Sequence, residues 1–462
     1  MIAALSPLDG RYAEKTQDLA KFLSEQGFIA YRMHVELRWL LHLLAWQDKG
    51  LLPLNVSISY EQKNQLATLA EYVLGERSFA QRAKVLERQT NHDVKAIEYT
   101  LAEHLRALGF GESLLSLIHF ACTSEDMNNL AYALMLRAAL EQSLAPRFKV
   151  LLAKLKSDAL RYQKLSMISR THGQKATPTT LGKEFAVFAY RLQKYADGVF
   201  TTPLSGKING ATGNYNAHHI VFPNTPWEEL ARDFVTTQLG LTFNPLTTQI
   251  EPHDTIVEML MKLAHLATIA IDLCRDFWGY IALGYLKQRI KSQEVGSSTM
   301  PHKVNPIDFE NAEGNFGLAS ALAQHMATKL PISRFQRDLS DSTVLRSLGS
   351  VLGYFHVAVQ ALQQGLNKVE ADDEAIARDL DEAWELLGEA LQTALRASGV
   401  SDAYERIKKL TRGRALGHRE YLRLVDEASE INADLKSRLR NLRPRDYVGL
   451  APDLVRAHMT DL

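Results

Sequence analysis

The sequence contains little cysteine and no excess of charge of either sign. Cys122 and Cys274 are the only cysteines, so neither a disulfide framework nor a cysteine-based zinc site is expected. So few cysteines also fit a reducing compartment. Lys and Arg total 53, and Asp and Glu total 53. A general nucleic-acid binder needs a basic excess, so we expect no nucleic-acid partner. A small anionic ligand needs only a few basic side chains and is not excluded.

Long apolar runs are also missing. The most apolar region, 257–286, is interrupted by charged residues such as Lys262 and Asp272. It falls short of the ~20 apolar residues that a membrane span needs. The N-terminal stretch lacks the basic start and the long apolar core of a secretory signal. These features predict a cytoplasmic protein without a membrane partner.

Proline is scarce over long stretches of the chain. The 14 prolines leave 54–145, 253–300 and 332–443 without one. Because proline breaks helix interiors, long helices can run through these gaps. Alternating strand patterns are limited to short pieces near 165–170 and 206–209. The chain is therefore predicted to be all-α, with apolar residues at helical spacing over 28–48, 91–108, 125–158, 254–290, 343–366 and 373–398.

Length and glycine-rich breaks predict three helical domains. At about 150 residues per domain, 462 residues correspond to about three domains. The breaks near 108–112 and 365–374 give an N-terminal helical domain over 1–112, a central bundle of long helices over 113–365 and a C-terminal helical domain over 366–462. Long helices of this kind often pack against other subunits, so we expect an oligomer.

The polar segments between the predicted helices carry the chemistry. The stretch GSSTMPHKVNP at 296–306 combines small residues, which let a backbone approach a ligand, with a cation and an amide. Lys303 and Asn305 make it less generic than an ordinary Gly-Ser surface loop. A second segment, 170–178, contains His172, which can act as an acid or a base near neutral pH. A lone histidine is more often a structural hydrogen-bonding residue, so both interpretations stay open.

Several predicted helices begin with residues that can cap a helix or bind an anion. The segments TNHD at 90–93, CTSEDMNN at 122–129 and DST at 341–343 share this construction. Each alone is explained by a cap. Free N–H groups at a helix start also face an anion, and several such starts together fit a multiply anionic ligand. The pair His218 and His219 has no evident third ligand, so no metal site is predicted.

These motifs resemble those of a known superfamily. GSSTMPHKVNP resembles the signature loop of the fumarase/aspartase superfamily, whose members eliminate fumarate or a related acid from a succinyl group. THGQ at 171–174, TSED at 123–126 and KINGATGNYNAH at 207–218 resemble the adenylosuccinate lyase family in its longer bacterial form. Related lyases and hydratases typically carry Leu where this chain has Gly173.

The resemblance implies a homotetramer built around long helices, with active sites shared between subunits. It implies small-molecule nucleotide substrates and no cofactor or metal. Two reactions of purine synthesis would follow. One splits adenylosuccinate into AMP and fumarate, and the other releases fumarate from the succinyl-aminoimidazole carboxamide ribotide.

The resemblance also implies roles for single residues. His172 would protonate the leaving nitrogen, and Ser297 would remove the proton from carbon, with Lys303 and Glu310 in support. From the residues alone, Ser297 and Ser298 are not distinguished, and Glu310 is equally a first-turn carboxylate favoured by the helix dipole. The substrate-binding positions implied are Arg11, Tyr12, Asn91, His92, Asp93, Thr123, Ser124, Gln249, Ser298, Lys303, Val304, Asn305, Asn311, Arg337, Ser342, Thr343, Val344, Leu345 and Arg346.

Three other interpretations are kept. The first is another fumarate-releasing lyase of the superfamily, such as an argininosuccinate lyase, against which the THGQ motif argues. The second is a helical scaffold that kept the fold and lost catalysis, which intact His172, Ser297, Lys303 and Asn305 disfavour. The third is a generic helical interaction protein, which does not explain the polar segments.

Overall fold

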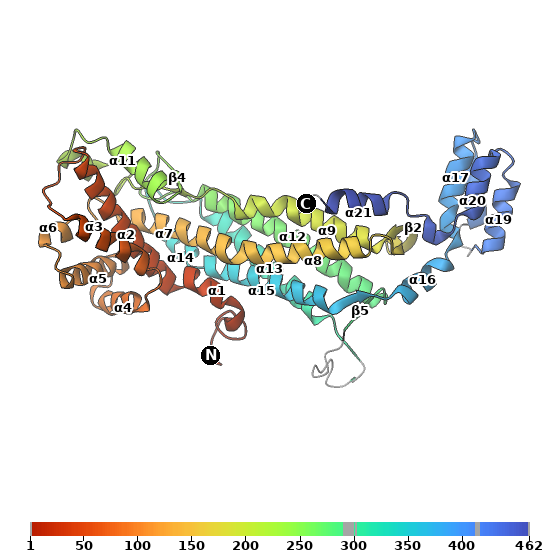
Figure 1. The fold of residues 1–462 in the computed structure, drawn as a ribbon, viewed down its shortest axis with the longest axis horizontal. Helices are drawn as coiled ribbons and strands as arrows, with labels where there is room; N and C mark the ends of the chain where they lie inside the picture. The colour runs from red at the N-terminus through yellow and green to blue at the C-terminus, as the bar shows by residue number, and fades with distance from the viewer. Residues whose placement is uncertain (1, 290–299, 301–302, 412–415, 461–462) are drawn as a thin grey trace. The chain divides into compact units, whose positions relative to one another are not determined.

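The computed structural model describes residues 2–289, 300, 303–411 and 416–460 (Figure 1). The regular structure in these ranges is mainly α-helical, with three sheets of two short strands each. The prediction of an all-α chain is confirmed. No helix in the described ranges combines the length and apolar character that crossing a bilayer requires.

The chain divides into two compact units. Unit 1 comprises Met1–Phe148, Tyr195–Thr268 and Asn315–Ala358, and unit 2 comprises Lys149–Lys194, Ile269–Gly314 and Val359–Leu462. Five long helices contribute residues to both units: α8 Ala145–Arg161, α9 Leu181–Phe200, α12 Asp254–Ala282, α13 Ile307–Lys329 and α15 Leu348–Lys368. The three-domain division at 112 and 365 stays a prediction.

Unit 1 is organised around a helix that is buried on most of its faces. This helix, α2, spans Glu25–Asp48 and packs against α3, α4, α5 and α7. Its buried residues include the charged or polar Arg32, Glu36 and His42 beside the apolar ones, so the helix lies in the core of this unit. The other elements of this unit are α1 Ala13–Leu23, α3 Tyr60–Tyr72, α4 Arg77–Thr90, α5 Asp93–Ala107, α6 Glu112–Leu115, α7 Ser124–Ala139, β3 Ser205–Gly206, α10 Asn216–Val221, α11 Trp227–Asp233, the π-helical turn Phe234–Gln238, β4 Thr242–Phe243 and α14 Ser340–Leu345.

Local chemistry sets where the long helices bend or end. A π-helical turn, Leu140–Leu144, joins α7 to α8 just before Pro146. Widening the helix there relieves the clash between a proline ring and the carbonyl one turn earlier. Helix α12 ends at Ala282, short of the predicted 290, because Gly284 adopts φ +75 and Tyr285 N–H donates to Tyr280 O at 2.9 Å. This is a Schellman termination.

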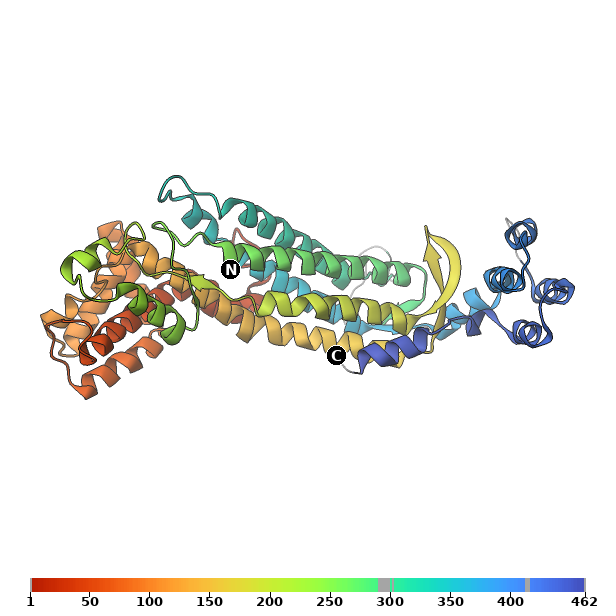
Figure 2. The same ribbon diagram turned by 90° about the horizontal axis from the view of Figure 1, so that it is seen from above.

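Unit 2 contains an antiparallel hairpin between α8 and α9 (Figure 2). Strand β1, Ser166–Thr171, pairs with β2, Gln174–Thr180. The remaining elements are β5 Leu286–Gln288, β6 Val369–Ala371, α16 Asp373–Asp381, the 3₁₀ helix Trp384–Leu387, α17 Gly388–Ala397, α18 Ala403–Thr411, α19 His418–Glu427, α20 Ala433–Asn441, the 3₁₀ helix Pro444–Asp446 and α21 Ala451–Met459. The predicted helices 343–366 and 373–398 are each interrupted, between α14 and α15 and between α16 and α17.

Candidate functional site

His172 lies at the tip of the β1–β2 hairpin in unit 2. Thr171 pairs with Gln174, so His172 and Gly173 are the two turn residues. Their φ values of +54 and +74 fit a type I′ turn, and histidine is among the residues that tolerate this conformation. The His172 side chain is exposed. Pro178 lies beside a register shift, where its missing N–H is tolerated.

The segment before α13 carries the other candidates of unit 2. Lys303 and Val304 are exposed, and Gln288 Nε2 donates to Val304 O at 3.0 Å. Glu310 lies in the first turn of α13, where its Oε1 accepts a hydrogen bond of 3.1 Å from Trp278 Nε1. Both interpretations of Glu310 therefore stay open. Asn305 and Asn311 flank this turn and are half-buried. Ser297 and Ser298 lie outside the described residues.

In unit 1, the turn between α4 and α5 forms a cap. Asn91 ends α4 with φ +49, and His92 begins α5 by accepting a 3.1 Å hydrogen bond from Lys95 N–H at Nδ1. The cap expected at 90–93 is present. Because Nδ1 accepts, the proton of the neutral ring belongs on Nε2, which leaves an exposed donor.

Asp93 connects this turn to Arg346. The buried Arg32 donates to Asp93 Oδ2 at 2.9 Å, and its guanidinium carbon lies 3.6 Å from the centroid of the Phe28 ring. Arg346 Nη2 lies 3.7 Å from the same carboxylate oxygen, and its Nη1 lies 3.2 Å from Glu25 Oε2. Burial raises the pKa of Asp93, but the Arg32 charge and hydrogen bonds lower it more, so the net shift is downward. Asp93 is therefore an ionised bridge between two arginines.

The start of α7 is fixed by a buried carboxylate. Asp126 Oδ2 accepts hydrogen bonds from Thr123 N–H at 2.8 Å and Gly210 N–H at 3.1 Å. Its Oδ1 accepts from Asn209 N–H at 3.1 Å and forms an ion pair of 2.8 Å with Lys207 Nζ. Both charged side chains have no exposed surface. Asp126 thus ties the candidate residues Thr123 and Ser124 to the 207–210 segment.

Arg337 brings further candidates together. Its Nη1 donates to Gln249 Oε1 at 3.1 Å, and its Nη2 lies 3.4 Å from Glu125 Oε2 at the start of α7. Gln249 Nε2 in turn donates to Ala211 O at 2.9 Å. Two positions predicted to bind substrate, Gln249 and Arg337, are thus in direct contact.

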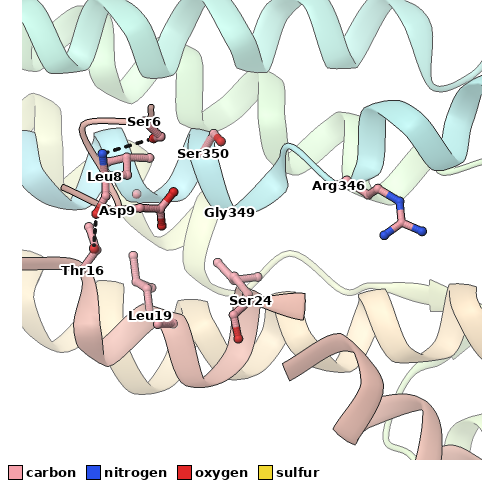
Figure 3. A pocket seen from close by; sticks show the side chains of 12 residues that line it. Ser6, Leu8, Asp9, Thr16, Leu19, Ser24, Arg346, Gly349 and Ser350 are labelled. Atoms are coloured by element: carbon pink, nitrogen blue, oxygen red, sulfur yellow. Dashed lines mark hydrogen bonds between the residues drawn. The ribbon is translucent and has the colours of Figure 1, made fainter. Parts of the chain in front are cut away.

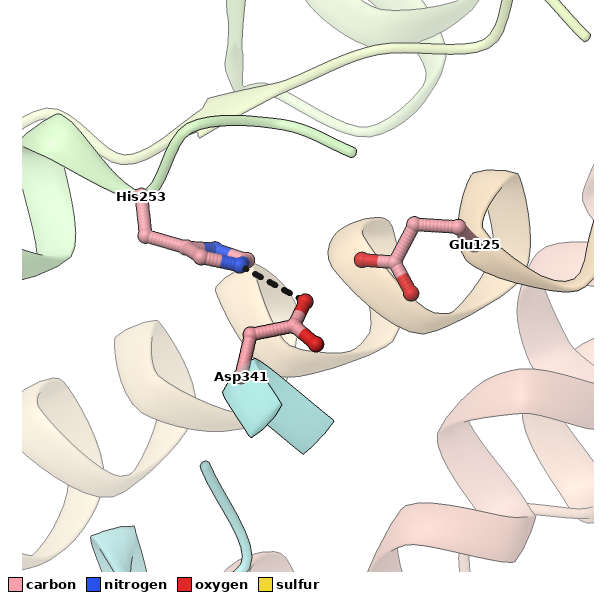
Figure 4. A group of neighbouring side chains, drawn as sticks. All are labelled: Glu125, His253 and Asp341. Atoms are coloured by element: carbon pink, nitrogen blue, oxygen red, sulfur yellow. Dashed lines mark hydrogen bonds and ion pairs between the residues drawn. The ribbon is translucent and has the colours of Figure 1, made fainter. Parts of the chain in front are cut away.

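A buried group of Glu125, His253 and Asp341 lies beside these residues (Figure 4). His253 Nε2 lies 3.4 Å from Asp341 Oδ2, and Asp341 Oδ1 accepts from Ser342 N–H at 2.7 Å. Glu125 and Asp341 fall inside the motifs read from sequence. His253 does not, and its only signal is its place between Pro252 and the start of α12.

Helix α14 holds four candidates, and Arg346 follows it. Ser342 and Val344 are half-buried and Thr343 is exposed, whereas the Leu345 side chain is buried and contributes packing. Arg346 also belongs to the lining of a pocket of about 210 Å³ (Figure 3). The other lining residues come from Ser6–Ser24 and Gly349–Gly353, the first of which contains the exposed Arg11 and the half-buried Tyr12. In Figure 3 the Arg346 guanidinium points away from Asp9 and Ser350.

Comparison with known proteins covers nearly the whole chain. Residues 10–319 match a family model described as "Lyase", and residues 333–448 match one described as "Adenylosuccinate lyase C-terminal". The chain is 45% identical over 453 residues to an adenylosuccinate lyase from Vibrio cholerae and 44% identical over 455 residues to one from Escherichia coli. Each alignment covers 98% of this chain and 98% of the relative.

Solved structures share the fold at low sequence identity. A fumarate lyase from Mesorhizobium matches with a TM-score of 0.72 at 17% identity, covering 96% of this chain and 97% of the other. A 3-carboxy-cis,cis-muconate lactonizing enzyme from Pseudomonas putida matches with a TM-score of 0.73 at 20% identity, covering 96% of each chain. These two likenesses establish the fold, and the full-length sequence matches establish the family. The chain belongs to the adenylosuccinate lyase family of the fumarase/aspartase superfamily.

Proposed function

We propose that the protein releases fumarate by β-elimination from adenylosuccinate, giving AMP, and from the succinyl-aminoimidazole carboxamide ribotide, in purine nucleotide biosynthesis. The observation that carries this proposal is the 45% identity to an adenylosuccinate lyase over 98% of both chains. The THGQ turn, with His172 exposed at its tip, supports it. No cofactor is needed, because the elimination transfers no electrons to or from the protein.

The chemistry explains the residue types. A proton leaves the carbon beside a carboxylate, and the bond from the neighbouring carbon to nitrogen breaks. We assign the removal of the proton to Ser297 and the protonation of the leaving nitrogen to His172, since an unprotonated nitrogen is a poor leaving group. Negative charge that develops on the carboxylate needs donors and cations, a role that suits Lys303 and the N–H groups beside it. Glu310, in the first turn of α13, is assigned the role of orienting the catalytic histidine.

The substrate's phosphate and carboxylates would contact the arginines and polar helix starts. Arg337 and Arg346 are each held by acidic or amide side chains, Arg337 by Glu125 and Gln249 and Arg346 by Glu25 and Asp93. A guanidinium held in this way loses less conformational entropy when it grips an anion in bidentate fashion. The remaining binding positions are Arg11, Tyr12, Asn91, His92, Thr123, Ser124, Ser298, Val304, Asn305, Asn311, Ser342, Thr343, Val344 and Leu345.

The assembly proposed is a cytoplasmic homotetramer whose active sites take residues from more than one subunit. The exposure of His172 within its own chain supports this, because acid–base groups work best where water is excluded. The three parts 1–112, 113–365 and 366–462 are proposed as the domains of each subunit.

Mixing the purified protein with adenylosuccinate and following both the ultraviolet change and fumarate tests the proposal. Product is expected from both purine substrates and not from argininosuccinate. His172→Ala and Ser297→Ala should each lower kcat about 10²- to 10⁴-fold, the usual contribution of acid–base catalysis, while size-exclusion shows an intact tetramer. His458→Ala, which changes an exposed histidine on α21, is the matched control. Absence of product from both purine substrates would refute the activity, and near-normal turnover in either variant would remove that residue from the mechanism.

A further inference from the structure

Five titratable side chains from three segments of unit 1 meet in its interior. Glu125 belongs to α7, Glu251 and His253 precede α12, Arg337 precedes α14, and Asp341 belongs to α14. Glu125, His253 and Asp341 are 1–2% exposed. Glu125 and Asp341 would be costly to bury as unpaired carboxylates, so each needs a cation nearby.

Arg337 and His253 supply those cations. Arg337 Nη2 faces Glu125 Oε2 at 3.4 Å, and His253 Nε2 faces Asp341 Oδ2 at 3.4 Å. Burial lowers the pKa of His253, but the hydrogen bond to Asp341 and the charges of Glu125 and Glu251 raise it more. Burial raises the pKa of Asp341, while His253 and the Ser342 N–H lower it to give a net downward shift. An imidazolium facing a carboxylate fits both shifts.

The backbone conformation of His253 is a second and independent observation. Its φ is +65, in the left-handed region that few non-glycine residues adopt. The contacts are visible: His253 N–H donates to Glu251 Oε2 at 2.7 Å, and the ring reaches Asp341. These contacts hold the backbone in the conformation that directs the imidazole toward α14.

A bound divalent cation is the alternative explanation of the same cluster. The donor atoms of Glu125, His253 and Asp341 lie within 4.8 Å of one another, a spacing that a cation could bridge. A third buried carboxylate, Glu251, has its Oε2 3.9 Å from His253 Nδ1. Treatment with EDTA separates a bound cation from an imidazolium.

We propose that His253 is a positioning residue that, as an imidazolium, holds Asp341 and thereby the first turn of α14 in the orientation that binds the substrate's anionic groups. The link is short, because Asp341 Oδ1 also accepts the Ser342 N–H at 2.7 Å. Ser342, Thr343 and Arg346 follow directly along the chain. The expected change in KM rests on the proposed function. The expected effect on the position of Asp341 and the Ser342 amide does not.

The variants His253→Leu and His253→Gln separate donor from charge. Leu removes both, and Gln keeps an N–H donor without the charge. We expect His253→Leu to raise KM for adenylosuccinate at least about tenfold with a smaller change in kcat, and His253→Gln to lie between Leu and wild type. His42→Gln is the matched control, because His42 is also buried and lies outside the cluster. Its ring Nε2 lies 3.0 Å from Leu230 O, and the nearest carboxylate described for it, that of Asp233, is 3.9 Å away. An unchanged KM in a folded His253→Leu tetramer would overturn the proposal.

The pH profile provides a readout that a merely structural role would not move. A raised pKa means that the stabilising imidazolium is present at low pH and is lost as the pH rises through the folded-state value. Wild-type KM should therefore rise above that pH, and the rise should be absent from His253→Gln. Persistence of the same rise in His253→Gln would overturn the proposal, even if His253→Leu fails to fold.

Hydrogen exchange of the Ser342 amide keeps the inference separate from the activity. Exchange should be faster in His253→Gln than in wild type and unchanged in His42→Gln, whether or not adenylosuccinate is cleaved. Wild type inactive on both purine substrates, with faster Ser342 exchange in the variant, would refute the proposed function and leave the positioning role standing. Equal exchange in the variant and wild type would refute the positioning role. Treatment with EDTA should leave wild-type KM unchanged, and a loss of affinity restored by zinc would refute the imidazolium account.

Discussion

The ion pair between Asp126 and Lys207 predicts an unequal cost for removing its two charges. Asp126 keeps three backbone donors if the lysine is replaced: Thr123 N–H at 2.8 Å, and Asn209 N–H and Gly210 N–H at 3.1 Å each. Within the described part of the chain, Lys207 keeps one acceptor, Gly210 O at 3.3 Å, if the carboxylate is neutralised. Neutralising Asp126 therefore leaves Lys207 as a buried charge with fewer partners than Asp126 keeps when Lys207 is replaced.

We expect Lys207→Met to cost about 3 kcal/mol and Asp126→Asn about 5 kcal/mol, the ends of the range for breaking a buried pair. Each oxygen of Asp126 faces two donors, so in Asp126→Asn the new NH₂ group faces two donors at either position. The double variant Asp126→Asn/Lys207→Met should cost less than the sum of the two, because no buried charge remains unpaired.

Hydrogen exchange of the Asn209 and Gly210 amides is the suitable assay, since a large oligomer rarely unfolds in a single reversible step. A loss of about 3 kcal/mol corresponds to about 100-fold faster exchange. Lys262→Met is the matched control, because Lys262 pairs at 2.6 Å with an exposed Glu258, and exposed pairs contribute about 0–1 kcal/mol. The reasoning is refuted if Lys207→Met costs as much as Asp126→Asn, or if both cost no more than the control.

Three further outcomes are expected. Arg346→Ala should raise KM for adenylosuccinate about tenfold or more, since a hydrogen bond to a charged group contributes about 1.5–3 kcal/mol, and unchanged KM and kcat would exclude the contact. Gly213→Ala should lower the melting temperature, because φ is +82 and a Cβ would lie 2.2 Å from Thr247 O, whereas Gly75→Ala, with open space, should not. Burial raises the pKa of the Cys274 thiol, so iodoacetamide should leave Cys274 unmodified in the folded protein at pH 8, and rapid labelling would contradict its placement in the core.

Helices whose apolar residues recur at helical spacing could be predicted from the sequence. The points where those helices are interrupted could not. The pattern over 28–48 corresponds to α2 and that over 91–108 to α5, because burial imposes the helical period. The break after α14 carries no proline or glycine signal at Arg346 and Ser347, so the period alone runs through it. Strand β2 was missed because Pro178 argues against a strand, and only the register shift beside it makes the proline acceptable.

The candidate site could be predicted as a set of motifs, not as a set of contacts. Two binding positions implied by the resemblance, Arg337 and Gln249, proved to be neighbours, 3.1 Å apart, although 88 positions separate them. Glu125, which faces Arg337, and Asp341, which faces His253, lay inside the motifs without an assigned role. His253 was not found, because a histidine after a proline has no periodicity or spacing that distinguishes it, and only the fold brings it to Asp341.

The two-residue turn at His172 and Gly173 constrains which residue can follow the histidine. None of the described residues lies within 4 Å of the place where a side chain at Gly173 would begin, so space is available for a larger residue. The obstacle is the backbone, whose φ of +74 disfavours a bulky residue such as leucine more than it disfavours histidine, asparagine or aspartate. Replacing Gly173 by the leucine that related lyases carry should therefore strain the turn even though space is available.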